Sequence, residues 1–142
     1  MRHQCIYLMM LLPLVGCAST QISSLNDIDK QEIRHICIEH NPKVIVADFE
    51  NILTKALDHQ GITSQIYNLN TPEHCSYILK YMAFQKWDFS MVLTLAELKL
   101  FKEGKPLRTA TYKLHAGGLL NPTKYKSNES KIFPLVDQLL EK

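Results

Sequence analysis

The stretch CSYILKYMAFQKWD, residues 75–88, sets the architecture of this chain because its side chains alternate along a long apolar run. Successive residues of a strand point to opposite faces of a sheet. One face would carry Tyr77, Leu79, Tyr81 and Ala83, and the other Ile78, Lys80, Met82 and Phe84. The alternation therefore predicts a strand over residues 75–85, followed by a turn at Trp87 and Asp88.

Helical spacing flanks this strand on both sides. Upstream, apolar residues recur at the spacing i, i+3, i+4, i+7 and i+8, which is typical of one face of a helix; they are Phe49, Ile52, Leu53, Ala56 and Leu57. Asp48 is the expected N-cap, and Gly61 stands where a left-handed residue ends a helix. Near the end of the chain a second set has helical spacing, with Pro134 in the first turn and Ser130 as a cap; it comprises Ile132, Leu135, Val136, Leu139 and Leu140.

The remaining segments favour strands. Short β-branched or apolar runs occupy residues 33–38 and 62–67. The apolar residues of 91–101 follow neither a helical nor a strand spacing throughout, and we predict a strand because the neighbouring segments are strand-like. The loop 102–106 would join this strand to another over 107–115 as a hairpin. The order β-α-β-β-β-β-α predicts an α+β fold, in which one largely antiparallel sheet of about four to five strands carries two helices on one face.

The start of the chain has the organisation of an export signal. Arg2 precedes an apolar run over residues 6–15, which is too short to cross a bilayer as a helix of about 20 residues. The run ends in Leu14-Val15-Gly16-Cys17, which resembles the lipobox of bacterial lipoproteins. The resemblance implies cleavage between Gly16 and Cys17, and lipidation of Cys17 by fatty acyl chains such as palmitate. An ordinary signal peptide that happens to contain a cysteine is the alternative.

The lipobox also predicts how the chain is divided. Residues 1–16 would be the signal peptide, and residues 17–30 the lipidated N-terminus with a polar, flexible tether. Residues 31–142 would form a single domain that faces the periplasm. The residue after the cysteine is Ala18 rather than Asp, which by the sorting rule of lipoproteins resembles a protein passed on to the outer membrane.

The cysteines fit export to an oxidising compartment. Cys5 would leave with the signal peptide and Cys17 would be acylated, so Cys37 and Cys75 remain. In an exported protein these two can form one intramolecular disulfide. Two buried free thiols are the alternative.

Few residues are candidates for chemistry. The formal net charge of +2 is too small to indicate a nucleic-acid-binding surface. No metal site and no cofactor are expected, because the histidines that remain after processing lack ligand spacing; they are His35, His40, His59, His74 and His115. Asp88 beside Trp87 and Ser90 is the one catalytic candidate, against a plain turn in which Trp87 packs on the core.

Basic residues gather around the predicted hairpin, and they allow two interpretations. They are Lys99, Lys102, Lys105, Arg108 and Lys113. The first interpretation is an anion-binding edge, formed by Lys99, Lys102, Lys105 and Arg108, that faces lipid phosphate or lipopolysaccharide. The second is a charged edge strand that resists aggregation.

Residues 75–88, together with ICIEHNPKV (36–44) and AELKLFKEGKPLRTATYKL (96–114), resemble a family of small Gram-negative lipoproteins of unassigned function. At the level of the fold, the chain is similar to periplasmic accessory lipoproteins, including the lipopolysaccharide-assembly type. The expected function is a non-catalytic binding or interaction module of the outer membrane, anchored through its lipid, with an envelope protein or lipopolysaccharide as partner. A lipid- or lipopolysaccharide-binding accessory protein is the alternative, and an envelope enzyme is a second one.

Overall fold

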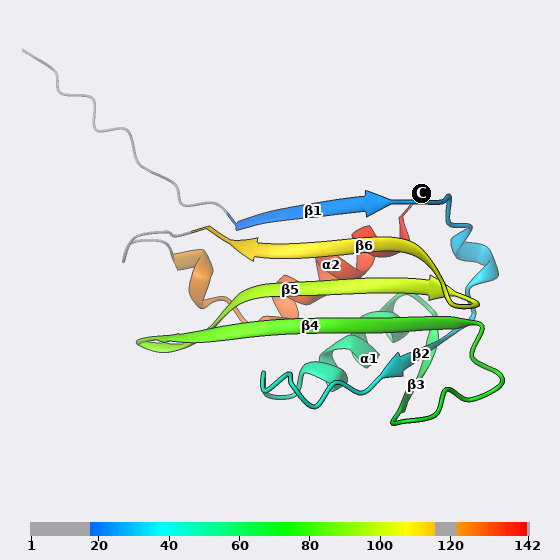
Figure 1. The fold of residues 1–142 in the computed structure, drawn as a ribbon. Coiled ribbons are helices and arrows are strands. Elements are labelled where there is room, and N and C mark those ends of the chain that lie inside the picture. The colour runs from blue at the N-terminus through cyan, green and yellow to red at the C-terminus, as the bar shows by residue number, and fades with distance from the viewer. Residues whose placement is uncertain (1–17, 116–121, 142) are drawn as a thin grey trace, which may run out of the picture.

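A computed structural model describes residues 18–115 and 122–141, so the leader and the sequence Leu14-Val15-Gly16-Cys17 lie outside the described residues. Within this part of the chain, two helices lie on one face of a six-stranded sheet (Figure 1). The elements are β1 (Ala18–Ser24), η1 (Lys30–Glu32), β2 (His35–Glu39), α1 (Phe49–His59), β3 (Thr63–Tyr67), β4 (Tyr77–Asp88), β5 (Ser90–Lys102), β6 (Lys105–Leu114), η2 (Pro122–Tyr125) and α2 (Asn128–Leu140). The predicted α+β class, with two helices beside one sheet, is confirmed.

The sheet is mixed, with strand order β1-β6-β5-β4-β2-β3. The pairs β1/β6, β6/β5 and β5/β4 are antiparallel, whereas β4/β2 and β2/β3 are parallel. The prediction of a largely antiparallel sheet with about four to five strands is therefore partly wrong. Helix α1 connects β2 to β3, and a helical crossover returns the chain to the end of the sheet where it started, which makes the two strands parallel.

The additional strand is β1, which replaces part of the predicted flexible tether. Ala18 to Ser24 pair along their whole length with β6, from Ala18 opposite Leu114 to Ser24 opposite Arg108. The strand has almost no buried side chain, because it is an edge strand of polar composition. An edge strand of this kind is held by backbone hydrogen bonds rather than by apolar burial, so hydrophobic periodicity gives no sign of it.

The core lies between the sheet and its helices. The whole predicted stripe of α1 is buried, and Gly61 follows the helix with φ +73°, the left-handed conformation that was expected. Asp48 is the N-cap but makes no side-chain capping bond, and α2 is capped by Ser127 rather than Ser130. No helix within residues 18–115 and 122–141 is long and apolar enough to span a bilayer.

Candidate functional site

The most unusual surface of the molecule is the tip of the hairpin between β4 and β5. Trp87, Phe89 and Met91 are exposed to 73%, 75% and 51% of their surface, and we call these three residues the apolar tip. Trp87 therefore does not pack on the core, contrary to the turn interpretation. Large apolar side chains grouped on an exposed surface mark sites that bind a partner or a membrane.

The backbone conformation at the tip is also strained. Asp88 pairs directly with Ser90, so Phe89 alone makes the turn, and its φ is +58°. This left-handed conformation costs a residue other than glycine roughly 1–2 kcal/mol. A turn that only had to reverse the chain would be cheaper with glycine or asparagine. The tip thus combines an exposed aromatic residue with backbone strain, a combination that is typical of functional sites.

Asp88 fastens this hairpin to the rest of the domain. Its Oδ2 lies 2.7 Å from Nζ of Lys124 in η2, and the Lys124 side chain is almost fully buried. The hydrogen bond that the Lys124 amino group donates to Asp88 raises the pKa of that amino group above its usual value. The backbone oxygen of Lys124 in turn accepts a bond of 2.7 Å from the amino group of Lys131. Asp88 therefore lies in an ion pair, not in the apolar pocket that a catalytic carboxylate beside Ser90 would need.

The apolar tip lies at the end of the sheet where β1 begins (Figure 1). Ser19 pairs with Lys113, and Lys113 pairs with Leu95, so these three residues form one row across the sheet. From this row the β4–β5 hairpin continues outward to Ser90, which places the tip roughly 13 Å beyond Ala18 at ~3.4 Å per residue. The chain enters β1 at Ala18, and Cys17 precedes it directly. Ala18, the residue that follows the candidate lipidation site, and the apolar tip are therefore at the same end of the domain.

The predicted basic edge does not form as one surface. The hairpin exists, with Glu103 and Gly104 in left-handed conformations at its turn. Arg108, however, is only 6% exposed, and its guanidinium donates to the backbone oxygens of Leu139 and Glu141 at the end of α2. The unpaired carbonyls of a helix C-terminus attract a cation, so Arg108 stabilises α2 and is not available to an external anion.

The lysines of that edge are mostly paired with nearby groups. Nζ of Lys99 lies 3.0 Å from Glu97, and Nζ of Lys102 lies 3.4 Å from Glu32. A hydrogen bond with Tyr77, and after it the bond with Glu32, raises the pKa of Lys102. Lys105 lies in the turn region at the end of the sheet opposite the apolar tip (Figure 1).

A polar cluster joins the start of α1 to β4, and its groups satisfy one another. The carboxylate of Glu50 accepts from the Tyr81 hydroxyl at 2.5 Å and lies 2.7 Å from Nδ1 of His40. The backbone N–H of Asn41 donates to the same hydroxyl at 3.1 Å. Burial, and then the bond to Glu50, raises the pKa of Tyr81. The cluster holds the loop after β2 against the sheet.

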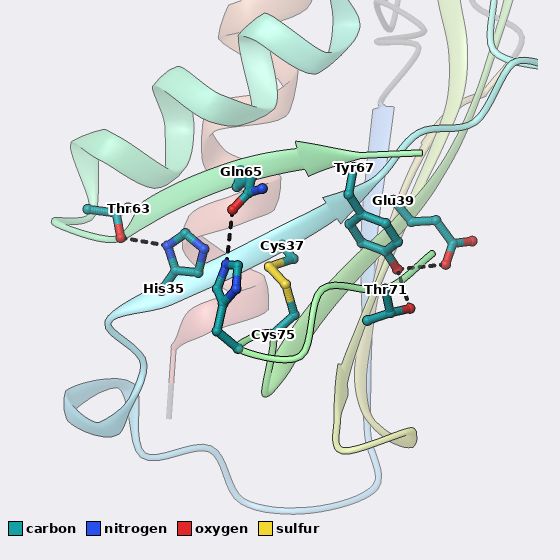
Figure 2. Close-up of a disulfide and its surroundings, with 9 residues drawn as sticks. His35, Cys37, Glu39, Thr63, Gln65, Tyr67, Thr71 and Cys75 are labelled. Carbon is teal, nitrogen blue, oxygen red and sulfur yellow. Dashed lines mark hydrogen bonds between the residues drawn. A yellow bond between two sulfur atoms is a disulfide. The ribbon is translucent and has the colours of Figure 1, made fainter. Parts of the chain in front are cut away.

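Cys37 and Cys75 form the predicted disulfide, with their Cα atoms 5.8 Å apart. Cys37 lies on β2, on the opposite face from Ile36 and Ile38, which point into the main core. The disulfide fixes the connection between β3 and β4 across this face (Figure 2). It therefore ties β2 to the residues just before β4, as expected from the sequence.

Two histidines meet beside the disulfide, which sequence reasoning missed. The rings of His35 and His74 lie 5.7 Å apart by their centroids. A signal was present, since each cysteine of the disulfide has a histidine within two residues, in His35-Ile36-Cys37 and in His74-Cys75. A bond between the cysteines brings the two segments that carry these histidines close together. Among the described residues, one donor atom each from His35, Cys37 and His74 lie within 4.8 Å of one another.

Comparison with known proteins identifies the fold and no family. No family model matches the chain, and no curated protein matches its sequence. The chain is similar to solved structures of PelC from Paraburkholderia phytofirmans, among them two dodecamers. A dodecamer of a PelC point variant has a TM-score of 0.58 and 14% identity, and the match covers 87% of this chain and 95% of that one. A second PelC dodecamer has a TM-score of 0.53 and 14% identity, with 88% and 96% covered. At this identity the likeness shows a shared fold.

Proposed function

We propose that this chain is a lipoprotein of the Gram-negative outer membrane, and that acylated Cys17 anchors it on the periplasmic side. Its domain would be a non-catalytic interaction module held against the bilayer. The lipobox-like sequence Leu14-Val15-Gly16-Cys17, followed by Ala18, supports the anchor and its destination. The disulfide between Cys37 and Cys75 fits a chain that folds outside the reducing cytoplasm.

The position of β1 carries the proposal that the domain docks on the membrane. Because β1 begins at Ala18, a lipid on Cys17 would be joined to the sheet with no flexible spacer between them. The end of the sheet that bears the apolar tip would then face the bilayer. Aromatic side chains are favoured at the boundary between lipid and water. Trp87, Phe89 and Met91 would enter this boundary beside the anchor.

Exposed lysines add to the attraction at this end of the domain. Lys86 lies in β4 beside the apolar tip, and Lys126 follows η2, whose Lys124 is bound to Asp88. Both side chains are exposed, and an amino group near a surface of anionic lipids contributes about 1 kcal/mol. The domain thus offers lipid both an apolar contact and a cationic rim.

The intact mass of the protein made in its own cells tests the anchor. We expect a chain that starts at Cys17 and carries the added mass of a diacylglyceryl group and an N-linked acyl group. A mature chain that is cut elsewhere, or that keeps residues 1–16 without lipid, would overturn the proposal.

A second copy of this chain is the partner that we propose to test first. Both PelC structures with this fold are dodecamers. In the described part of this chain, β1 and β3 are the two edge strands of the sheet. An edge strand offers backbone hydrogen bonds to a neighbouring molecule. We expect the detergent-solubilised, lipidated protein to sediment as an oligomer, and a monomer at every protein concentration would contradict self-assembly.

A further inference from the structure

The cluster around the disulfide consists of three rows of side chains on one face of β2 and β3. His35 lies opposite Thr63, Cys37 opposite Gln65, and Glu39 opposite Tyr67. Figure 2 shows how Cys75 reaches this face from the connection between β3 and β4. In the third row the Tyr67 hydroxyl donates to Glu39 at 2.9 Å, and Glu39 also lies 3.2 Å from Nζ of Lys80. In the first row, Nε2 of His35 is buried without a hydrogen-bond partner.

The hydrogen bonds of His35 define which of its nitrogens is free. The Thr63 hydroxyl donates its one hydrogen to the backbone oxygen of Arg34 at 3.0 Å. The contact of 2.8 Å between Thr63 Oγ1 and His35 Nδ1 must therefore have the ring N–H as donor. In the neutral ring, Nε2 then carries a lone pair, and this atom is buried with no hydrogen-bond partner. A buried acceptor without a partner is costly, so its presence calls for an explanation.

His74 is arranged in the same way. One of its nitrogens, Nε2, lies 3.0 Å from Oε1 of Gln65. The amide oxygen accepts, so this nitrogen donates, and Nδ1 carries the lone pair of the neutral ring. A histidine that binds a metal usually donates its other ring N–H to a protein oxygen, which fixes the tautomer and the orientation of the ring. Thr63 and Gln65 give His35 and His74 this support.

We propose that the reduced form of this cluster binds Zn²⁺ through His35, Cys37, His74 and Cys75. Two thiolates and two imidazoles are a common donor set of tetrahedral zinc. Atoms of His35, Cys37 and His74 already lie within 4.8 Å of one another, and Cys75 is bonded to Cys37. His74 is exposed, which gives the ion a path from solvent. This inference is independent of the membrane anchor proposed above.

The oxidation state of Cys37 and Cys75 would control whether this site binds the metal. A dithiol reductant transfers two electrons to the Cys37–Cys75 bond and becomes a disulfide itself, which leaves two protein thiols. Binding of Zn²⁺ to the two sulfurs then releases two protons. Oxidation of the thiolates by a disulfide reverses the reaction and expels the ion. The oxidised protein keeps only two imidazole donors, which is too few for a tight site.

Metal titration of the full-length chain tests the proposal. Cys5→Ser and Cys17→Ser leave Cys37 and Cys75 as the only cysteines. The chain is titrated with Zn²⁺ against a chromophoric chelator, with the disulfide intact and after reduction by a phosphine. We expect one tightly bound ion in the reduced chain and none in the oxidised chain. Co²⁺ in place of Zn²⁺ should give visible bands of tetrahedral cobalt and a sulfur-to-cobalt charge-transfer band.

Variants separate the site from simple thiol binding. His35→Gln and His74→Gln should each weaken zinc binding by at least about 100-fold, and Thr63→Val should weaken it by about 10–100-fold. His59→Gln is the matched control, since His59 lies on α1 beside Phe133, and it should change nothing. Equal zinc affinity in the His35→Gln and His74→Gln chains would overturn the proposal, as would equal binding by the oxidised chain.

If reduction destabilises the fold, circular dichroism shows whether the reduced chain is folded with and without Zn²⁺. A reduced chain that unfolds and is restored by Zn²⁺ supports the site, because metal binding is then coupled to folding. A reduced chain that binds no zinc, whether it is folded or unfolded, contradicts it.

Discussion

Replacing Cys17 by serine is expected to remove the protein from the outer membrane. In the proposed lipidation, the thiol of Cys17 accepts the lipid, and a serine hydroxyl does not replace it in that reaction. Each buried CH₂ contributes about 0.8 kcal/mol, so more than one acyl chain gives stable anchoring, whereas one chain binds only marginally. We expect the amount of Cys17→Ser protein in the outer-membrane fraction to fall to background. Its intact mass should show residues 1–16 still attached and no acyl group.

Cys5→Ser is the matched control for this experiment. Cys5 lies within the predicted signal peptide, so its loss should leave both the location and the mass of the mature protein unchanged. If Cys17→Ser chains stayed in the outer membrane at the normal level, the anchor would lie elsewhere in the chain. The proposed role of Cys17 would then be wrong.

Removal of the disulfide is expected to cost the domain about 2–4 kcal/mol of its free energy of unfolding. Cys37 and Cys75 are separated by 38 residues in the sequence, and the chain-entropy model assigns about 4 kcal/mol to a loop of that length. The structural effect should be local. The bond holds the β3–β4 connection against β2, and Cys37 itself is fully buried.

Urea unfolding of the Cys37→Ala, Cys75→Ala double variant measures this effect. The reduced natural chain, in a buffer that contains a metal chelator, is the control, because it loses the cross-link but keeps both sulfur atoms. The two should lose similar stability relative to the oxidised chain. A change below about 0.5 kcal/mol in both would show that the cross-link does not stabilise the domain.

The sequence predicts the parts of the fold that bury apolar side chains with a regular period. The stripe from Phe49 to Leu57 gives α1, and the alternation from Tyr77 to Ala83 gives β4. The polar loop Lys102–Pro106 predicts the β5–β6 hairpin, and the two cysteines that remain after processing predict the disulfide. In each case a local pattern reports directly on which face is buried.

The remaining features depend on contacts that have no local pattern. Strand β1 is polar and is held through backbone bonds to β6, so its sequence looks like a tether. Arg108 is found with the lysines in sequence, but the end of α2 binds it in the fold. The neighbourhood of His35 and His74 arises only when the cysteines beside them join. Each of these features needs the tertiary structure.

The apolar tip gives the clearest example of the same limit. The sequence predicts a turn at Trp87 and Asp88, whereas both residues belong to β4 and the chain turns at Phe89. A single sequence also does not show on which side an aromatic residue will lie. Within the described residues, the hairpin extends past the neighbouring strands, and Trp87 and Phe89 stay largely exposed. Large apolar side chains grouped on an exposed surface mark a site that binds a partner, and the proposed partner is the bilayer.

Fluorescence of Trp87 in reconstituted vesicles tests most directly whether the domain docks on the membrane by its apolar tip. Trp87 is the sole tryptophan of the chain, so its emission needs no separation from other signals. The lipidated protein is placed in vesicles and compared with the Cys17→Ser chain in buffer. In vesicles we predict protection from an aqueous quencher and quenching by lipids with brominated acyl chains. If Trp87 is as accessible to the aqueous quencher in vesicles as in buffer, and brominated lipid has no effect, the docking of the apolar tip is contradicted.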